Sequence, residues 1–216
     1  EVYSKDQSGK KYKIYLDEKM RIHDLNILEK LIRTFQKHPD IGALGLAGTK
    51  VFPLNPAAYM SAKKRTGRMR IGAEVKEYIW EDLTGEYQET ETLDEYFIAM
   101  QYDLPWREDL FSGESFCGIA QCMELHRKGY KTAVINQQSF SGHYIAEQVP
   151  FEETARQSFL KEYAKEIYPL VTVMIPTFNR PDYLKVALES VIHQTYHNLD
   201  IVVTDNSTNE LTRQMM

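Results

Sequence analysis

The stretch from Val171 to Asn206 restricts the possible folds more than any other part of the chain. Residues Val171 to Ile175 form an apolar run typical of a strand buried in a parallel sheet. Pro181 follows a short turn and suits the first turn of a helix. Leu199 to Val203 is a second strand pattern. A strand, a helix and a strand of this length predict a right-handed βαβ unit and place the chain in the α/β class.

Two more strands, with a helix between them, are predicted nearer the start. Lys13 to Leu16 is a short apolar-biased run, and Ile41 to Ala47 is a second one. Between them, Asp24 is positioned to cap a helix that ends at His38, before a proline. Apolar residues at helical spacing form its expected buried face: Leu25, Leu28, Leu31, Ile32 and Phe35.

Later segments continue the alternation of strands and helices. The acidic stretch 74–95 contains alternating aromatic residues and predicts a hairpin with a turn near Gly85. A helix is expected to end at Lys128, because a basic last turn followed by a glycine is a frequent helix end. Lys131 to Ile135 is expected to be a strand, and residues 151–167 an amphipathic helix.

Composition excludes several classes of protein. With 43% apolar and 26% charged residues, the chain can form a packed core. The net charge of −5 argues against a dedicated nucleic-acid binder, and no apolar run approaches the ~18–20 residues of a spanning helix. Cys117 and Cys122 are five positions apart, which predicts buried, reduced thiols rather than a zinc or redox site. We therefore expect a cytoplasmic protein, with peripheral attachment to the inner membrane face as the alternative for the intact molecule.

Polar residues follow several of the predicted parallel strands. In open α/β sheets, ligands bind at the carboxyl ends of the strands. An acid and a histidine that meet there can hold a divalent cation, although a single loop histidine is more often only structural. We therefore expect Asp17 and His143 to lie within reach of a common ion or phosphate. The polar residues at strand ends are Asp17, Glu18, His143, Thr177, Asn179 and Asp205.

The last part of the chain resembles a known family. Val171 to Leu184, Leu188 to Tyr196 and Ile201 to Ser207 are similar to the opening of family 2 glycosyltransferases, with three motifs in order at natural spacing. In that family the opening unit binds the nucleotide half of a nucleotide-sugar. The resemblance implies that Thr177 and Asn179 line the nucleotide pocket and that Asp205 accepts a hydrogen bond from the base.

Residues about 12–145 resemble the later half of a bacterial glycosyltransferase-like family. The most specific match is Tyr102 to Phe111. The resemblance implies a GT-A fold, which is a Rossmann-like sheet of nucleotide-diphospho-sugar transferases with flanking helices. It also implies an acidic metal motif at Asp17, acids near the acceptor, and a late histidine, His143, that completes a Mn or Mg site.

The chain departs from that pattern at three positions. Lys19 stands where the resemblance implies a metal-binding aspartate, and Ser115 and Gly118 stand where it implies acids. Asp109 and Glu114 are therefore the candidate catalytic carboxylates, and dependence on a divalent cation stays open. The ammonium of Lys19 is itself a candidate to neutralise a diphosphate.

The order of the two resemblances predicts an excised or incomplete domain. Residues 1–167 would be the later part of one GT-A-like domain, and residues 168–216 the nucleotide-binding βαβ opening of a family 2 module. The expected activity is sugar transfer from a nucleotide-sugar donor to a glycan or glycoprotein acceptor, with little or no transfer by this piece alone. Two alternatives stay open: a degenerate glycosyltransferase module that only binds, and a nucleotidyltransferase, which the lack of a glycine in the 176–181 loop disfavours.

Overall fold

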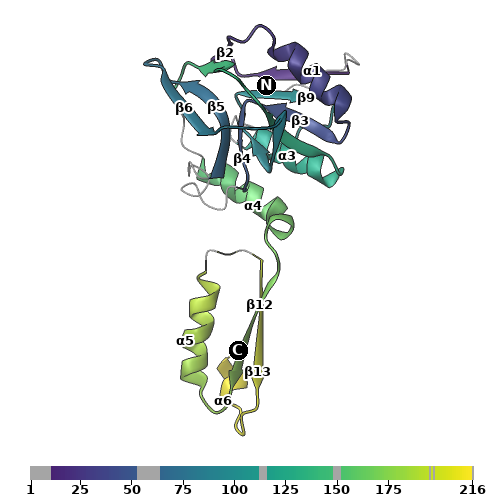
Figure 1. Ribbon diagram of the computed structural model, residues 1–216. Helices are drawn as coiled ribbons and strands as arrows, with labels where there is room; N and C mark the ends of the chain where they lie inside the picture. Colours follow the sequence, from purple (N-terminus) through teal and green to yellow (C-terminus); the bar gives the residue numbers. More distant parts are fainter. Residues whose placement is uncertain are drawn as a thin grey trace. The chain divides into compact units, whose positions relative to one another are not determined.

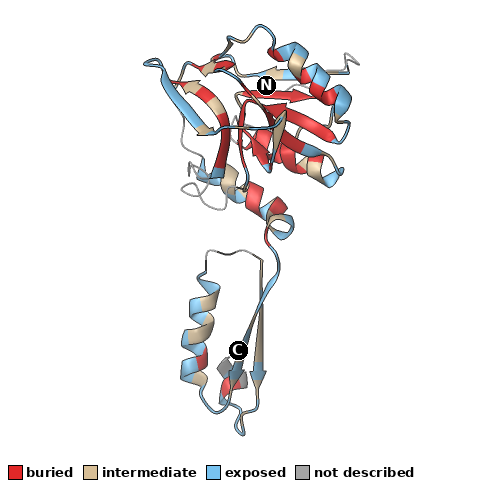
Figure 2. Ribbon diagram, in the orientation of Figure 1, coloured by how far each residue is buried: buried red, intermediate tan, exposed pale blue. Residues whose placement is uncertain are grey.

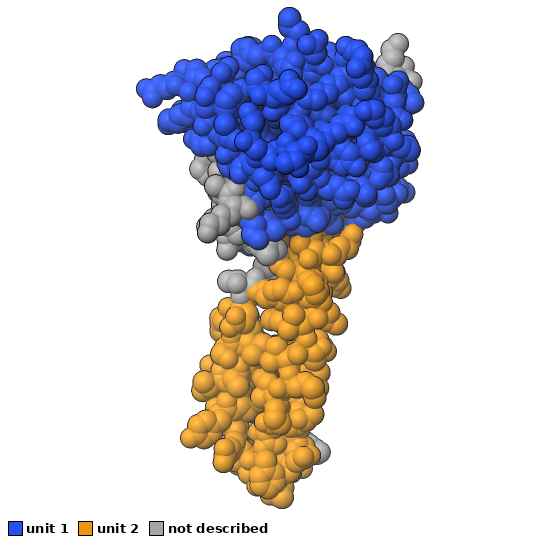
Figure 3. Space-filling model, in the orientation of Figure 1, with its two compact units in different colours: residues 1–158 blue, residues 159–216 orange. Residues whose placement is uncertain are grey.

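The chain divides into two compact units, Glu1–Ser158 and Phe159–Met216 (Figure 3). Within the described ranges, no helix is both long enough and apolar enough to cross a membrane. The computed structural model describes residues 11–52, 64–111, 116–147, 152–194, 196 and 198–215 (Figure 1).

The first unit contains a five-stranded sheet with both parallel and antiparallel pairs. β1 and β3 each run antiparallel to β9, and β10 runs parallel to β3. The strands β1, β3 and β10 therefore point the same way, and their carboxyl ends lie at one edge of the sheet. In spatial order the strands are β1 (Lys13–Leu16), β9 (Phe97–Met100), β3 (Ile41–Gly45), β10 (Lys131–Ile135) and β7 (Tyr87–Thr90).

A second sheet of the same unit consists of shorter strands. The expected strand 41–47 is divided between the two sheets, because β3 ends at Gly45 and β4 begins at Ala47. The expected loop at 141–143 is largely strand β11, which pairs with both β2 and β5. The order is β2 (Met20–Ile22), β11 (Gly142–Tyr144), β5 (Arg65–Ile71), β4 (Ala47–Thr49) and β8 (Thr92–Leu93), with β6 (Lys76–Glu81) paired to β5.

The helices of the first unit are α1 (Ile27–Lys37), α3 (Cys117–Arg127) and the beginning of α4 (Glu153–Ile167), whose residues after Ser158 belong to the second unit. Figure 2 shows that the central strands of the first sheet, β9, β3 and β10, are mostly buried. The buried side of α1 is narrower than expected, since Leu28 and Ile32 are 45% and 38% exposed. The helix buries a single stripe at i, i+3 and i+4 spacing instead, whose members are Ile27, Leu31, Thr34 and Phe35.

The expected hairpin around Gly85 is wrong. β6 pairs antiparallel with β5 across the turn that follows Gly72, which adopts a φ of 86°. β7 lies instead at the edge of the first sheet, antiparallel to β10. The alternating aromatic residues therefore predict where the strands lie but not which strands pair. Thr90 of β7 pairs with Thr132 of β10, 42 residues later in the chain, and no local pattern indicates a partner at that distance.

The second unit contains the expected βαβ motif. Its strands β12 (Val171–Thr177) and β13 (Leu199–Asp205) pair in parallel, with α5 (Pro181–Ile192) between them in the chain and α6 (Leu211–Met215) after them. The expectation that Val171 to Ile175 is fully buried is wrong here, because β12 alternates between exposed and half-buried residues. Two strands and one long helix provide too few layers to cover both faces of a sheet.

Candidate functional site

Asp17 lies at the carboxyl edge of the first sheet, as the sequence predicts. It follows β1, and its backbone N–H donates to the carbonyl of Tyr96 at 3.1 Å. Its Oδ1 accepts a hydrogen bond from the backbone N–H of Lys19 at 2.7 Å. The Lys19 carbonyl in turn accepts from the N–H of Ile145 at 3.0 Å. The turn that carries Asp17 and Lys19 is therefore fixed to two neighbouring strands.

Glu95 brings a second carboxylate to the same edge. It directly precedes Tyr96, the residue bonded to Asp17, and its Oε1 accepts from the N–H of Gly118 in the first turn of α3 at 2.7 Å. A Cβ on residue 118 would lie 2.6 Å from Glu95 Cγ, so this carboxylate occupies the space of a side chain at 118. The end of β1 and the start of α3 therefore meet at Glu95.

The sequence analysis did not single out Glu95. It belongs to the acidic stretch 74–95, where a solvated surface is the ordinary explanation of the charge. Its distance of 23 residues from Gly118 matches no local motif. The only signal in the sequence is the absence of an acid at residue 118, and that absence does not indicate which residue replaces it.

A buried ion pair supports the turn that carries Glu95. Arg65 and Asp94 are 3% and 7% exposed and form a direct ion pair. The guanidinium carbon of Arg65 also lies 4.3 Å from the centre of the Trp80 ring. The backbone N–H of Asp94 donates to Ala47 at 2.9 Å. Buried charges of this kind persist only when paired, so Arg65 fixes the position of the residue next to Glu95.

His143 lies on β11, close to the same elements. Its Nε2 lies 2.9 Å from the Gly72 carbonyl, which can only accept, so Nε2 carries the proton and Nδ1 has the free lone pair. The next residue, Tyr144, stacks on Tyr96 with ring centres 4.0 Å apart. The described residues contain no group of three or more His, Cys, Asp or Glu side chains arranged to hold a metal. A shared ion between Asp17 and His143 stays a prediction.

The structure describes only one of the two candidate catalytic carboxylates, Asp109. Asp109 forms a two-point ion pair with Arg107, with N–O distances of 2.9 Å for both bonds. These bonds hold the pKa of Asp109 below its usual range, which weakens it as a base. Glu114 lies outside the described residues, as does Ser115.

The second unit brings together its three predicted nucleotide-binding residues. Thr177 and Asp205 are paired at the carboxyl ends of β12 and β13. Asn179 adopts a left-handed φ of 51°, and its Oδ1 accepts from the N–H of Thr208 at 3.0 Å. Asp205 accepts from the N–H of Ser207 at 2.8 Å. Two strand-end loops are therefore tied together around the expected nucleotide position.

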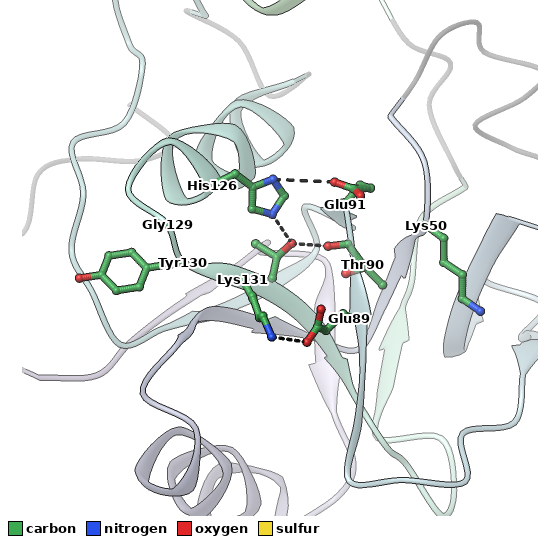
Figure 4. Close-up of a pocket in the computed structure, with 9 residues that line it drawn as sticks. Lys50, Glu89, Thr90, Glu91, His126, Gly129, Tyr130 and Lys131 are labelled. Atoms are coloured by element: carbon green, nitrogen blue, oxygen red, sulfur yellow. Dashed lines mark hydrogen bonds and ion pairs between the residues drawn. The ribbon is translucent and has the colours of Figure 1, made fainter. Parts of the chain in front are cut away.

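A cavity at the opposite edge of the first sheet was missed by the sequence analysis. It has a volume of about 550 Å³ and lies where β10 begins (Figure 4). No motif indicates it, because its wall combines residues from three separate stretches of the chain. Charged and titratable residues on the wall are Lys50, Glu89, Glu91, His126 and Lys131.

Comparison with known proteins identifies families for both parts of the chain. Residues 4–163 match the model of a glycosyltransferase-like family, and residues 172–216 match the model of glycosyl transferase family 2. An uncharacterized glycosyltransferase of Rickettsia bellii is 35% identical over 43 residues, which is 20% of this chain and 6% of that protein. Uncharacterized glycosyltransferases of Rickettsia typhi and Haemophilus influenzae are 36% and 39% identical over 44 residues. Those segments cover 20% of this chain and 14% of each relative.

The chain therefore spans only 6% to 14% of the length of these curated relatives. The first family match covers well over half of the 216 residues. By this match the chain belongs to the glycosyltransferase-like family, and it carries a family 2 glycosyltransferase segment at residues 172–216.

Proposed function

We propose that the intact protein is a bacterial glycosyltransferase of GT-A-like fold that transfers a sugar from a nucleotide-sugar to a hydroxyl of a glycan or glycoprotein. One observation carries the proposal for the first unit. The carboxyl end of β1, with Asp17 and Lys19, meets the start of α3 at the carboxylate of Glu95. This edge is where α/β sheets bind ligands, and it holds both acidic and basic side chains.

The proposed roles follow from the charges at this edge. Glu95 removes the proton from the acceptor hydroxyl, in preference to Asp109, whose pKa is lowered by Arg107. The hydroxyl then displaces the diphosphate in a single step with inversion, as the family 2 resemblance implies. Lys19 offers a fixed positive charge to the leaving diphosphate.

No group of three or more His, Cys, Asp or Glu side chains is gathered among the described residues. A Mg²⁺ ion beside a diphosphate is usually held by one or two carboxylates together with waters and the phosphates, and Asp17 would be the protein ligand of such an ion. Lys19 stands in the metal motif itself. We assign the neutralising charge to this side chain and route no step through a metal.

We further propose that residues 1–167 are the later part of one transferase domain and residues 168–216 the nucleotide-binding opening of another. Asp205, Thr177 and Asn179 would hold the nucleotide, and their convergence at two strand ends supports this. Cys117 and Cys122 are buried and form no disulfide, which fits a reducing compartment such as the cytoplasm.

The second candidate function is a glycosyltransferase-like module that binds without catalysis. It is favoured by Lys19 and Gly118, which stand where the resemblance implies acids. In that case the site would bind a nucleotide-sugar and leave it intact.

The test uses the intact protein and measures transfer and hydrolysis of several nucleotide-sugars. We expect turnover that falls by about 10²–10⁴-fold in Glu95→Gln, the range typical of a lost general base. The matched control is Glu74→Gln, an exposed acid of a turn, which should keep wild-type rates. Binding without turnover in the wild type would establish the second candidate function, and full activity of Glu95→Gln would exclude Glu95 as the base.

A further inference from the structure

Strand β1 forms an edge of the first sheet. It is terminal in the spatial order of the strands, and among the described residues it pairs only with β9. The backbone N–H of Asp17, just after β1, points toward β9, because it donates to Tyr96. Backbone groups alternate in direction along an antiparallel strand, so those of Ile14 and Leu16 point away from β9. The edge therefore offers backbone donors and acceptors to an added strand.

This edge lacks the charged protection that usually prevents a strand from pairing with another molecule. Lys13 is the charged residue of β1, but it forms an ion pair with Asp103 and its side chain is only 9% exposed. Ile14 and Leu16 are apolar, and they are 41% and 46% exposed. The most exposed side chains of β1 are therefore the ones that water solvates least well.

The exposed apolar side chains of β1 lie on the same side of the sheet as α1. Side chains alternate along a strand, and Tyr12, two positions before the first of them, stacks on Phe35 of α1 with ring centres 5.8 Å apart. The other side of β1 contacts the loop after β9, where the rings of Tyr15 and Trp106 have centres 4.7 Å apart. An added strand would therefore place its alternate side chains next to α1.

One flank of α1 is fixed at the opposite end of the sheet. Lys30 donates to the carbonyl of Asn136, next to β10, and Lys37 lies 3.1 Å from Glu86, next to β7. Both strands lie at the far end of the sheet from β1. The other flank of the helix therefore faces the edge at β1.

The flank of α1 that faces β1 is apolar and exposed. At about 3.6 residues per turn, Leu28 and Ile32 lie close to the direction of Phe35, whose ring contacts the residue before β1. Leu28 and Ile32 are 45% and 38% exposed, and Leu25, two positions before the helix, is 96% exposed. The edge strand and this apolar row together form one surface that a second strand and helix could cover.

We propose that two copies of the chain associate through this surface, with β1 of one copy antiparallel to β1 of the other around a two-fold axis. The axis passes beside Tyr15, so that Ile14 of each copy lies opposite Leu16 of the other. The outward backbone groups of these residues then bond to each other across the axis, and the two sheets become continuous. This register keeps the apolar side chains of both strands on the α1 side.

The position of α1 along β1 places the helix on the same axis. Only three residues separate the end of α1 from β3, which is parallel to β1, so α1 runs antiparallel to β1. Tyr15 lies about 10 Å along the strand from Tyr12, at ~3.3 Å per residue. The same distance along the helix corresponds to about seven residues before Phe35, at ~1.5 Å per residue. The axis therefore passes close to Leu28.

The apolar row is self-complementary about that point, which favours a second copy over an unrelated strand. The Leu28 side chains of the two copies meet at the axis. Leu25 and Ile32 are placed at nearly equal distances on either side of it, so each faces the other residue in the second copy. Leu25, the most exposed large apolar side chain of the described residues, thereby acquires an apolar partner.

The test measures the mass of the 216-residue chain by sedimentation equilibrium over a range of concentrations, where we expect a reversible dimer. Leu28→Glu should raise the dimer dissociation constant by about 100-fold, because two carboxylates would meet at the axis. Ile14→Lys should also weaken the dimer, because it adds the charge that normally protects an edge strand. The matched control is Ile79→Glu on β6, where the side chain is 54% exposed, and it should leave the dissociation constant unchanged.

A cysteine placed at the axis tests the geometry directly. Leu28→Cys should form a disulfide between two copies when an oxidant is added, whereas Ile79→Cys should not, and the natural Cys117 and Cys122 are buried. Circular dichroism and thermal unfolding check that each variant is folded. The proposal is overturned if the wild-type chain is a monomer, which would leave the edge to a strand of another protein. It is also overturned if folded Leu28→Glu and Ile14→Lys dimerise like the wild type, if Ile79→Glu weakens the dimer equally, or if Leu28→Cys does not cross-link.

Discussion

The carboxylate of Glu95 and the backbone N–H of Gly118 are joined by a hydrogen bond of 2.7 Å, and a Cβ on residue 118 would lie 2.6 Å from Glu95 Cγ. The two residues therefore need the same space, and only a glycine at 118 lets the carboxylate reach the first turn of α3. This contact ties the turn before β9 to α3, and it is the basis of the first prediction.

Gly118→Ala should destabilise the protein by about 1–3 kcal/mol, because the added methyl group forces Glu95 aside. A loss of stability would identify this clash, because replacing a glycine inside a helix by alanine otherwise stabilises a protein by roughly 0.5–1 kcal/mol. Guanidinium unfolding measures the change. In a Glu95→Ala background the loss should be smaller, because only the contact of the new methyl group with Ile98 Cδ1, at 2.9 Å, then remains. An equal loss in both backgrounds would refute the coupling.

Arg65→Met should cost about 3–5 kcal/mol, because it leaves the buried carboxylate of Asp94 without its partner. The double substitution Arg65→Met with Asp94→Leu should recover most of that loss. The matched control is Arg33→Met, which breaks the exposed pair with Glu29 on α1 and should cost at most about 1 kcal/mol. Equal effects of Arg65→Met and Arg33→Met on urea unfolding would contradict this prediction.

The half-buried His126 should make the protein less stable in mild acid. Its pKa is lower in the folded than in the unfolded state, so below the usual value near 6.5 the unfolded chain binds more protons. Stability therefore falls as the pH decreases through that value. Thermal unfolding of wild type and His126→Gln between about pH 7.5 and pH 5.5 measures this contribution.

The difference in stability between the wild type and His126→Gln should become smaller as the pH falls. Glu91, whose raised pKa acts in the opposite direction, is present in both proteins, so its effect largely cancels in the comparison. A wild-type protein that loses no more stability in acid than His126→Gln would show that this histidine does not titrate as proposed.

Both cysteines should be unreactive in the folded protein. Burial raises the pKa of Cys117 and of Cys122 to about 12, so neither provides thiolate near neutral pH. A thiol reagent such as DTNB should label neither residue in native buffer and both in guanidinium chloride. Rapid native labelling of Cys122 would indicate that α3 opens locally, since that side chain is 1% exposed.

Local sequence patterns predicted where many of the elements lie. The apolar runs at Lys13–Leu16 and Lys131–Ile135 are strands with the expected bounds, and the βαβ unit that ends at Asp205 is present. The helix end at Lys128 is also confirmed, with Gly129 at a φ of 80°. Such features depend on side-chain periodicity and on backbone preferences, which act within a few residues.

What only the tertiary structure decided is which distant segments meet. The division of residues 41–49 between two sheets, the pairing of β7 with β10, and the contact of Glu95 with Gly118 all join parts of the chain that no local pattern connects. The cavity with Glu91 and His126 arises in the same way, from elements distant in sequence. Hydrogen bonds and packing select these partners once the chain is compact. The sequence by itself therefore determined many of the elements and the family, whereas long-range pairing determined the site.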